Sequence, residues 1–484
     1  MRRQWCKAYL AILILCFHWS MVAFTEFQIS RSNRGFSFLG DWVVTDFEEV
    51  YDTEITLIGN LVVEDTLVLN HVRLNFNCSS PGQFGIIVTY PGFLRLENGS
   101  EVNAIYYTIP YYFIIYPEGK LSITDSEIHH CGFQSPYRES WGLMIWNART
   151  SVIRNSTLSN NYVGLVVLGE SPFGTSPVIE GNLIANNTLD GVWTGYNFAL
   201  TQLHHNWIID NGGNGVCSWG NTELIGNVIA GNHIGLSIQN SPLNDVKNNT
   251  IIHNGICGIL INSSYVPIDG NVIAYNNGSG IIGAGLFVDI HNNNIFGNGL
   301  WGVFDPDAYF NASLNWWGSS LGPGITAHPD DMDPEEINGT MDYEPWLTEP
   351  YYCGVPPQIM ISYPHQNEII SGSTTVSTQV ASLFTIERVD FFLDDIWMAT
   401  DSEPPYEWTF NSFFIPDGPH TLSAVVINLI GVQGENKLAV MIDNQLIRGN
   451  MVLLSIGGIG MAVGIFVLII IIKRRWNMPS NGNK

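Results

Sequence analysis

Apolar and polar positions alternate through the middle of this chain in a pattern that returns every 21 to 27 residues. Each copy carries apolar, mostly β-branched residues at every second position around an asparagine, then a second asparagine, and then a glycine followed by another apolar residue. Alternation with a period of two is typical of short strands with one buried face. A repeat of roughly 22 residues is too short for a pair of helices and fits one coil of a β-solenoid.

The asparagines are predicted to be structural. Asparagine tolerates left-handed backbone at a corner, and its amide can bond the asparagine of the next coil, so the side chains are expected to stack as a ladder. The pattern places the first copy at Asn155 and Asn160. The later first asparagines, which form the predicted ladder, are Asn182, Asn206, Asn227, Asn249, Asn271 and Asn293.

The solenoid begins before these copies, in a wider register. Leu67, Leu94 and Leu121 follow one another at intervals of 27 residues. From there to Asn315 we count about 11 coils, and a strand spacing of ~4.8 Å makes the rod about 50 Å long. The sequence therefore predicts an all-β chain with an N-terminal cap at 25–54, a β-helix at 55–320 and a C-terminal cap or linker at 321–354.

The asparagine repeat ends in a distinctive run, Asn315-Trp316-Trp317-Gly318, followed by Tyr343-Glu344-Pro345-Trp346-Leu347. Together they resemble the right-handed parallel β-helix of pectin-lyase-like proteins, in the asparagine-rich subgroup that includes periplasmic maturation proteins for a copper enzyme, nitrous-oxide reductase. The resemblance covers residues 55–347 and implies that fold. It implies no particular chemistry, because lyases, hydrolases, epimerases and adhesins share the fold.

The two ends of the chain indicate a membrane-anchored surface protein. Cations precede an apolar run inside residues 1–24, which is typical of a secretory signal peptide. Residues 451–472 carry no charge and are followed at once by Lys473, Arg474 and Arg475. That length spans a bilayer, and the cations mark the cytoplasmic side. We expect a transmembrane helix at 451–472 and a cytoplasmic tail at 473–484.

A second domain is predicted at 355–445. Apolar and polar residues alternate there between turn signals, as in Val389-Asp390-Phe391-Phe392-Leu393 and Asp417-Gly418-Pro419-His420-Thr421. Such spacing is typical of a β-sandwich. The segment resembles the Ig-like modules of bacterial and archaeal surface proteins, and the simplest role for it is a spacer between the rod and the membrane.

The charge balance limits the partners. The chain has 19 Lys and Arg against 44 Asp and Glu, a net charge of −25. Three cations precede the signal run and four lie in the tail, so the predicted ectodomain is more acidic still. An acidic surface repels nucleic acid and anionic polymers, and it suits cations or neutral glycans. Nine N-x-[ST] sequons permit glycosylation, and the cysteines show no metal-site spacing.

Two outward-facing rows carry the candidate chemistry. The polar row contains Asp245, Asp269, Asp289 and His291, which could hold an acid and base or a divalent cation such as Ca²⁺; a solvated polar face is the simpler alternative. No cofactor is otherwise evident. The aromatic row contains Trp146, Trp193 and Trp219, which could stack on sugar rings, unless loops such as Ser171 to Pro177 cover them.

These patterns favour an extracellular β-helix protein that binds carbohydrate or envelope components. A polysaccharide-active hydrolase or epimerase is the alternative, and a metal-handling accessory protein is the third. A pectate-lyase mechanism is disfavoured, because Lys247 is the only Lys or Arg between Asn155 and Glu387, whereas the lyases that this chain resembles use an arginine base and further cations. Asp305-Pro306-Asp307 resembles a D-P-x-D motif of alginate epimerases and also fits an ordinary turn.

Overall fold

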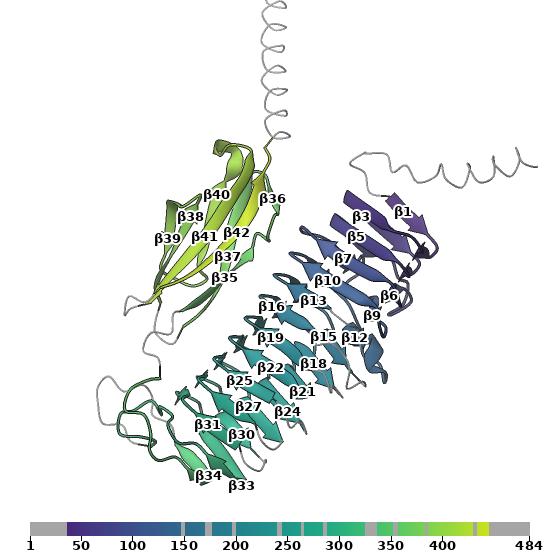
Figure 1. Cartoon of the computed structure of the whole chain (residues 1–484). Helices are drawn as coiled ribbons and strands as arrows, with labels where there is room; N and C mark the ends of the chain where they lie inside the picture. Colours follow the sequence, from purple (N-terminus) through teal and green to yellow (C-terminus); the bar gives the residue numbers. More distant parts are fainter. Residues whose placement is uncertain are drawn as a thin grey trace, which may run out of the picture. The chain divides into compact units, whose positions relative to one another are not determined.

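Short parallel strands stacked coil upon coil form most of this computed structural model (Figure 1). It describes residues 36–146, 151–169, 177–195, 200–239, 244–262, 266–283, 288–324, 336–351, 357–382, 386–428 and 433–444. The predicted signal peptide and the predicted transmembrane helix and tail lie outside these ranges. Within them, no helix is long and apolar enough to cross a membrane.

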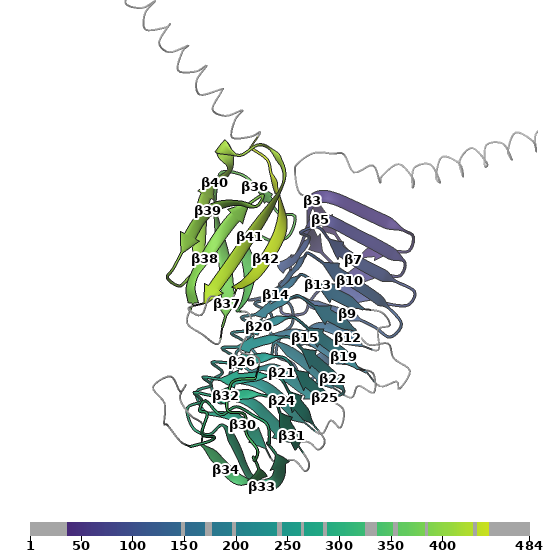
Figure 2. The same ribbon diagram turned by 60° about the vertical axis from the view of Figure 1, so that its left-hand side comes forward.

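Each central coil contributes three strands, and equivalent strands pair in three parallel columns; β13, β14 and β15 mark one coil in Figure 2. The first column contains β1 (Phe36–Leu39), β3 (Glu48–Ile58), β5 (Thr66–Phe76), β7 (Phe93–Glu97), β10 (Lys120–Thr124), β13 (Val152–Arg154), β16 (Val178–Glu180), β19 (Thr201–His204), β22 (Thr222–Ile225), β25 (Asn244–Lys247), β28 (Pro267–Asp269) and β31 (Val288–His291). The second contains β8 (Glu101–Ala104), β11 (Glu127–His129), β14 (Thr157–Ser159), β17 (Leu183–Ala185), β20 (Trp207–Ile209), β23 (Val228–Ala230), β26 (Thr250–Ile252), β29 (Val272–Ala274) and β32 (Asn294–Phe296).

The third column contains β2 (Trp42–Val44), β4 (Leu61–Val63), β6 (Gly85–Val88), β9 (Tyr112–Ile115), β12 (Gly142–Trp146), β15 (Val163–Leu168), β18 (Val192–Gly195), β21 (Asn214–Trp219), β24 (Ile234–Gln239), β27 (Cys257–Asn262), β30 (Ser279–Gly283), β33 (Val303–Asn311) and β34 (Ile337–Asp342). A short 3₁₀ turn, η1 (Arg138–Ser140), precedes β12. The solenoid has about 11 turns, and the predicted right-handed parallel β-helix is confirmed.

The apolar positions of the repeat form the core of the rod. In the central coils, each strand points one or two alternate residues inward, where they are buried, because strands alternate between core and solvent. In the coil of β25, β26 and β27 these residues include Val246, Ile251 and Ile259, all 0% exposed. The first copy was placed one residue too early: its inward residues are Ile153 and Leu158, not Val152 and Thr157.

The asparagine column is continuous and buried. Asn249 donates through Nδ2 to Asn271 Oδ1 at 3.0 Å and to the Leu224 carbonyl at 2.9 Å, and Asn271 repeats this with Asn293. The same register places Ser156 and Asn161 in the two ladders, where the sequence pattern had suggested Asn155 and Asn160. Left-handed backbone belongs to the residue before each ladder asparagine, such as Asn248 (φ 55°) before Asn249.

The glycine after each second asparagine is required for space. A Cβ on Gly215 would lie 2.7 Å from the Gly235 carbonyl oxygen and 2.8 Å from Asn232 Nδ2. A side chain there would therefore push apart the next coil and its ladder amide. The ladder ends at Asn315, whose carbonyl accepts from Leu347 N at 2.9 Å, and Trp317 is fully buried beside it.

The segment after the solenoid forms two packed sheets. One contains β35 (Gln358–Tyr363), β37 (Ser373–Ala381) and β40 (Glu407–Asn411). The other has the order β36 (Ile369–Ile370), β42 (Gln433–Ile442), β41 (Gly418–Asn428), β38 (Ile386–Leu393) and β39 (Ile396–Asp401), with η2 (Ser412–Phe414) before β41. Inward residues of both sheets, including Val376, Phe391 and Trp408, form its own core.

Contacts join this module to the outer face of the second column. That face is apolar along β20, β23 and β26. There Trp207, Val228 and Ile252 form one buried cluster with Ala381, and Met360 of the module packs against it. The spacer interpretation did not include such packing. It explains why outward positions of β20, β23 and β26 can be apolar without being exposed.

Candidate functional site

The predicted polar row lies on the outer face of the first column. Strand pairing places Lys247, Asp269 and His291 opposite one another in three successive coils. The four candidate residues do not converge on one point. Asp245 forms an ion pair with Lys247 at 3.1 Å, and the Asp289 side chain is 65% exposed.

Asp269 and His291 lie at paired strand positions of adjacent coils. Asp269 Oδ1 accepts from Asn292 Nδ2 at 2.8 Å, and His291 Nδ1 donates to the Ser313 carbonyl at 2.8 Å. These contacts fix both side chains while leaving His291 Nε2 toward Asp289, at 3.8 Å. Among the described residues no group of three His, Cys, Asp or Glu could hold a metal ion.

The predicted aromatic row lies on the outer face of the third column. Pairing of β12, β15, β18 and β21 places Trp146, Leu168, Gly195 and Trp219 at equivalent positions of successive coils. At ~4.8 Å per coil, Trp146 and Trp219 are about 14 Å apart along the rod. Tyr116 precedes Trp146 in the same row, with ring centroids 6.0 Å apart.

Trp193 does not present its ring to solvent, because it is only 3% exposed. Its indole lies over Gly195, where even a Cβ would collide with it. Arg138 of η1 covers the indole, with Cζ 4.0 Å from the ring centroid, and Trp141 packs edge-on at 6.4 Å. The predicted role of Trp193 as a stacking surface therefore needs correction: it supports Arg138.

Arg138 was missed by the sequence reasoning, which considered only cations after Asn155. A guanidinium on an indole face gains cation–π attraction. No ion pair or hydrogen bond joins this guanidinium to another described side chain, so its donors remain available. Met144, Val166 and Cys217 form one buried cluster with Trp193. Burial raises the pKa of the Cys217 thiol to about 12, so this thiol is unreactive.

The surface that results has two aromatic ends and a cationic centre. Trp219 is 40% exposed and Trp146 is partly buried, and Arg138 on Trp193 lies at the register position between Leu168 and Trp219. The aromatic row of Trp146, Trp193 and Trp219 thus extends to Tyr116 at one end and carries Arg138 on Trp193. Flat rings with a forked donor between them can bind sugar faces and hydroxyl oxygens.

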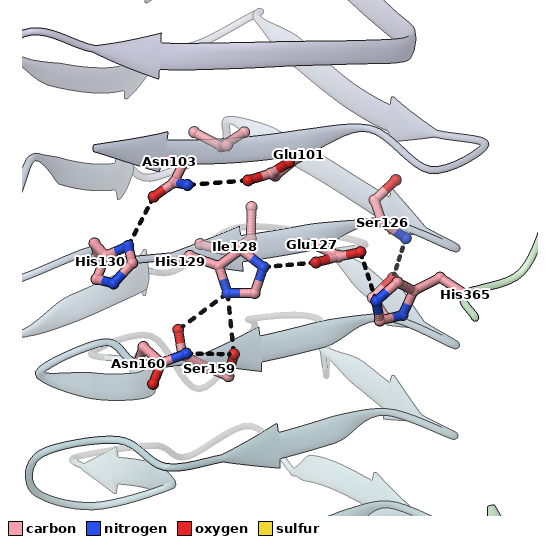
Figure 3. Close-up of polar contacts among 12 residues, drawn as sticks. Glu101, Asn103, Ser126, Glu127, Ile128, His129, His130, Ser159, Asn160 and His365 are labelled. Carbon is pink, nitrogen blue, oxygen red and sulfur yellow. Dashed lines mark hydrogen bonds and ion pairs between the residues drawn. The ribbon is translucent and has the colours of Figure 1, made fainter. Parts of the chain in front are cut away.

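A second polar cluster lies on the outer face of the second column (Figure 3). Glu127 Oε2 accepts from His129 Nε2 at 2.6 Å, and its Oε1 accepts from His365 Nε2 of the Ig-like module at 2.9 Å. His129 Nδ1 lies 3.0 Å from Ser159 Oγ. The sequence could not indicate this cluster, because His365 is more than 200 residues from its partners.

The electrostatics of this cluster favour the charged forms of Glu127 and His365. Burial opposes ionisation of Glu127, but its hydrogen bonds to His129 and His365 and their charges outweigh burial and hold its pKa well below the usual range. Burial likewise opposes protonation of His365, and Glu127 outweighs it, so the pKa of His365 is raised. The pair is thus an ion pair at mildly acidic pH.

By residue type, Ser159, His129 and Glu127 resemble a hydrolase triad. However, Ser159 is only 7% exposed, so a substrate carbonyl has no approach to its hydroxyl. The cluster therefore serves to join the module to the solenoid. Beside it is a pocket of about 230 Å³, lined on the solenoid by Asn155, Thr157 and Gly181 and on the module by His365, Gln366 and Asn436.

Two family models match the chain. The right handed beta helix region matches residues 75–229 and 218–326, which together exceed half of the chain. The bacterial Ig domain matches residues 357–424. No curated protein matches the chain.

Several solved structures are similar in fold. A mutant of the periplasmic alginate epimerase AlgG has 17% identity and a TM-score of 0.43, covering 62% of this chain and 74% of its own. The siphovirus 9NA tailspike receptor binding domain has 8% identity and a TM-score of 0.33, covering 84% and 99%. Fibronectin(III)-like modules of Clostridium thermocellum CbhA have 22% identity and a TM-score of 0.17, covering 18% and 94%. None of these similarities bears on the activity of this chain.

Proposed function

This chain belongs to the right-handed β-helix family, and we propose that it is a membrane-anchored surface protein that binds a carbohydrate along its aromatic row. The single observation behind the proposal is the position of Trp146 and Trp219. They occupy equivalent positions of coils about 14 Å apart, on one face, with Arg138 on its indole between them. Two platforms at that separation suit two non-adjacent sugar rings of one polysaccharide chain.

The charge of the protein favours a neutral glycan. The net charge of −25 repels polyanions over the length of the rod. The Arg138 guanidinium can instead donate to hydroxyl oxygens while the indole faces stack on the apolar faces of pyranose rings. The proposed ligand is therefore a neutral polysaccharide or glycan of the cell envelope, lying parallel to the solenoid axis.

The membrane location rests on the sequence. The uncharged stretch 451–472 is long enough to span a bilayer, and the cations after it favour a cytoplasmic tail. We propose a cell-membrane protein with an extracellular N-terminal ectodomain. Truncation after Asn450 should release soluble protein to the medium, and protease added outside intact cells should digest the solenoid. Retention of the truncated form in the membrane would show that the N-terminal apolar run is an uncleaved anchor.

A binding screen tests the ligand. The ectodomain from Glu26 to Asn450 is measured against neutral and acidic polysaccharides by affinity electrophoresis, together with Trp146→Ala and Trp219→Ala. Each variant should weaken binding to a neutral glycan by about 5- to 30-fold, which corresponds to ~1–2 kcal/mol for a lost stacked ring. Trp397→Ala is the matched control, because that ring is 58% exposed on the Ig-like module.

Binding that Trp219→Ala leaves unchanged would place the ligand elsewhere. Retention of affinity by Arg138→Met, with loss in the tryptophan variants, would show that stacking alone carries recognition. Exclusive binding of acidic polysaccharides would overturn the proposed ligand class while leaving the site in place.

Polysaccharide hydrolysis or epimerisation is the second candidate, because Asp269 and His291 lie at paired positions of adjacent coils and His291 Nε2 is 3.8 Å from Asp289 Oδ1. An acid and a base on neighbouring coils can act on a single bond. Reducing-sugar release and isomer analysis on any bound glycan test this function. Turnover that disappears in Asp269→Asn with Asp289→Asn, while binding persists, would establish it.

A further inference from the structure

One end of the Ig-like module gathers its exposed apolar side chains. In the five-stranded sheet, Ile369 pairs with Met441, Gly418 with Ile442, and Leu393 with both Leu422 and Ile396. The end of β42 and the start of β41 therefore lie at one end of the module, and the β38–β39 turn lies on the same side, four residues along β41 from Gly418. The large apolar side chains that are exposed on the described part of the module are Tyr363, Ile369, Ile396, Trp397, Met398, Phe414 and Met441. Ile369 and Met441 lie at the end of β42, and Ile396 and Trp397 lie at the start of β39, beside the β38–β39 turn.

The most exposed of these residues lie in η2 and at the start of β39. Phe414 in η2 is 84% exposed, Ile396 is 66% exposed and Trp397 is 58% exposed. Such values are unusual for three large apolar side chains in a domain that buries Phe391 and Trp408. Trp397 also donates through Nε1 to Thr400 Oγ1 at 3.2 Å, which holds the indole on the surface of its strand.

The chain leaves the module at this same end. Asn444 N donates to Asp417 Oδ1 at 3.0 Å, and Asn444 Oδ1 accepts from Ser412 Oγ at 2.8 Å, so the last described residue is fixed beside η2. Only residues 445–450 separate it from the uncharged stretch 451–472. Even fully extended, that connection reaches about 25 Å. If 451–472 spans the bilayer, the apolar end of the module lies close to the headgroups.

The acidic charge at this end of the module favours zwitterionic lipids over anionic ones. Asp394, Asp395, Asp417 and Asp443 lie close in sequence to the apolar residues. Among the described residues of this region, His420 is paired with Asp394 at 2.6 Å and Lys437 with Asp395 at 3.2 Å. An acidic rim is repelled by an anionic surface. Tryptophan, in contrast, is enriched at bilayer interfaces, and phenylalanine occurs with it on the apolar face of interfacial segments.

We propose that this end of the Ig-like module is a membrane-contact surface, in which Trp397, Ile396 and Phe414 enter the headgroup region of a zwitterionic bilayer. The surface rests on the proposed anchor only for its approach to the membrane, since its chemistry lies within the module. The module would then be held against the bilayer, and would fix the position of the β-helix more closely than a flexible stalk.

The test uses the full chain in phosphatidylcholine nanodiscs that contain brominated phosphatidylcholine, which quenches nearby indoles. The emission of Trp397 is obtained as the wild type minus Trp397→Phe, and we expect it to be quenched. Trp219→Phe is the matched control, and the emission that it removes should show no bromolipid quenching. Ile396→Ser with Phe414→Ser should reduce the quenching of Trp397 at least two-fold, and nanodiscs half composed of anionic lipid should do the same.

The outcomes separate this inference from the anchor. A chain that stays with the nanodisc after alkaline wash, but whose Trp397 emission is unquenched, overturns the contact surface and leaves the anchor in place. A chain that is washed off contradicts the anchor, and quenching of its Trp397 by added brominated vesicles would then still support the surface. Equal quenching of Trp219 and Trp397, or stronger quenching with anionic lipid, would overturn the proposed surface.

Discussion

Inside the β-helix every coil repeats the same kinds of residue, whereas the outer faces change from coil to coil. The inward positions of β26 and β29 are both isoleucine, and the ladder positions before them are both asparagine, all buried. On the outside, one face is covered by the Ig-like module and another exposes Trp219. The repeat therefore encodes the scaffold, and the residues that break the repeat give each outer face its own chemistry.

The interior should fail most severely when a charge enters it. Ile251→Asp would place a carboxylate among fully buried apolar residues without a partner, and should destabilise the solenoid by several kcal/mol. Thermal unfolding measures the effect, and Ile251→Val is the control, with an expected cost of about 1 kcal/mol. An unchanged melting temperature for Ile251→Asp would mean that residue 251 does not lie in a uniformly apolar interior.

The ladder should be the next most sensitive feature. Asn254 donates to Asn276 and to the Ile229 carbonyl, and accepts from the backbone and the side chain of Asn232. At about 1 kcal/mol for each lost bond, Asn254→Ala should cost roughly 4 kcal/mol in urea unfolding. Asn277→Ala changes an exposed asparagine of the next coil and should cost less than about 0.5 kcal/mol. Equal costs for the two variants would remove the distinction between inside and outside.

Two tryptophans on the outer face of the third column should differ in how much their removal lowers stability. Trp193→Ala removes a ring that is 3% exposed and carries Arg138, so stability should fall by about 3–5 kcal/mol. Trp219→Ala removes a ring that is 40% exposed and should leave stability within about 0.5 kcal/mol. Urea unfolding distinguishes them, and a large loss in Trp219→Ala would show that this ring is a packing residue.

The smallest effect should come from the pair that joins the module to the solenoid. The pKa of Glu127 is lowered, so its contribution is present above its unfolded value near 4.5 and is lost at lower pH. The pKa of His365 is raised, so its contribution is full below about 6.5 and is lost as pH rises through the folded value. The contact should therefore be strongest between about pH 4.5 and 6.5.

His365→Gln tests this pH dependence. Removal of a charged hydrogen bond near the surface should cost about 1 kcal/mol at pH 5.5 and less at pH 8.5. The measurement is the difference between wild-type and variant melting temperatures at the two pH values. His233→Gln, the same substitution elsewhere on the solenoid, is the control. A larger loss at pH 8.5 than at pH 5.5 would contradict the raised pKa of His365.

The sequence predicted the fold well because the repeat contains local information. Each buried isoleucine and each ladder asparagine lies within a few residues of the turn that orients it. The first copy was misplaced by one residue because Asn155 and Asn160 match the pattern in letters, while Ser156 and Asn161 occupy the ladder in space. A serine hydroxyl can accept the same backbone bond, and a pattern built on asparagine does not include it.

The candidate sites were harder to predict because exposure depends on contacts distant in sequence. The solenoid, its core and the rows of outward residues could be predicted from the sequence, since strand alternation and coil stacking follow from the repeat. That Arg138 covers Trp193, that Trp219 stays exposed and that His365 reaches Glu127 became visible only in the folded chain. Those contacts join segments whose spacing obeys no repeat, so the folded chain alone determines which outward side chains face solvent.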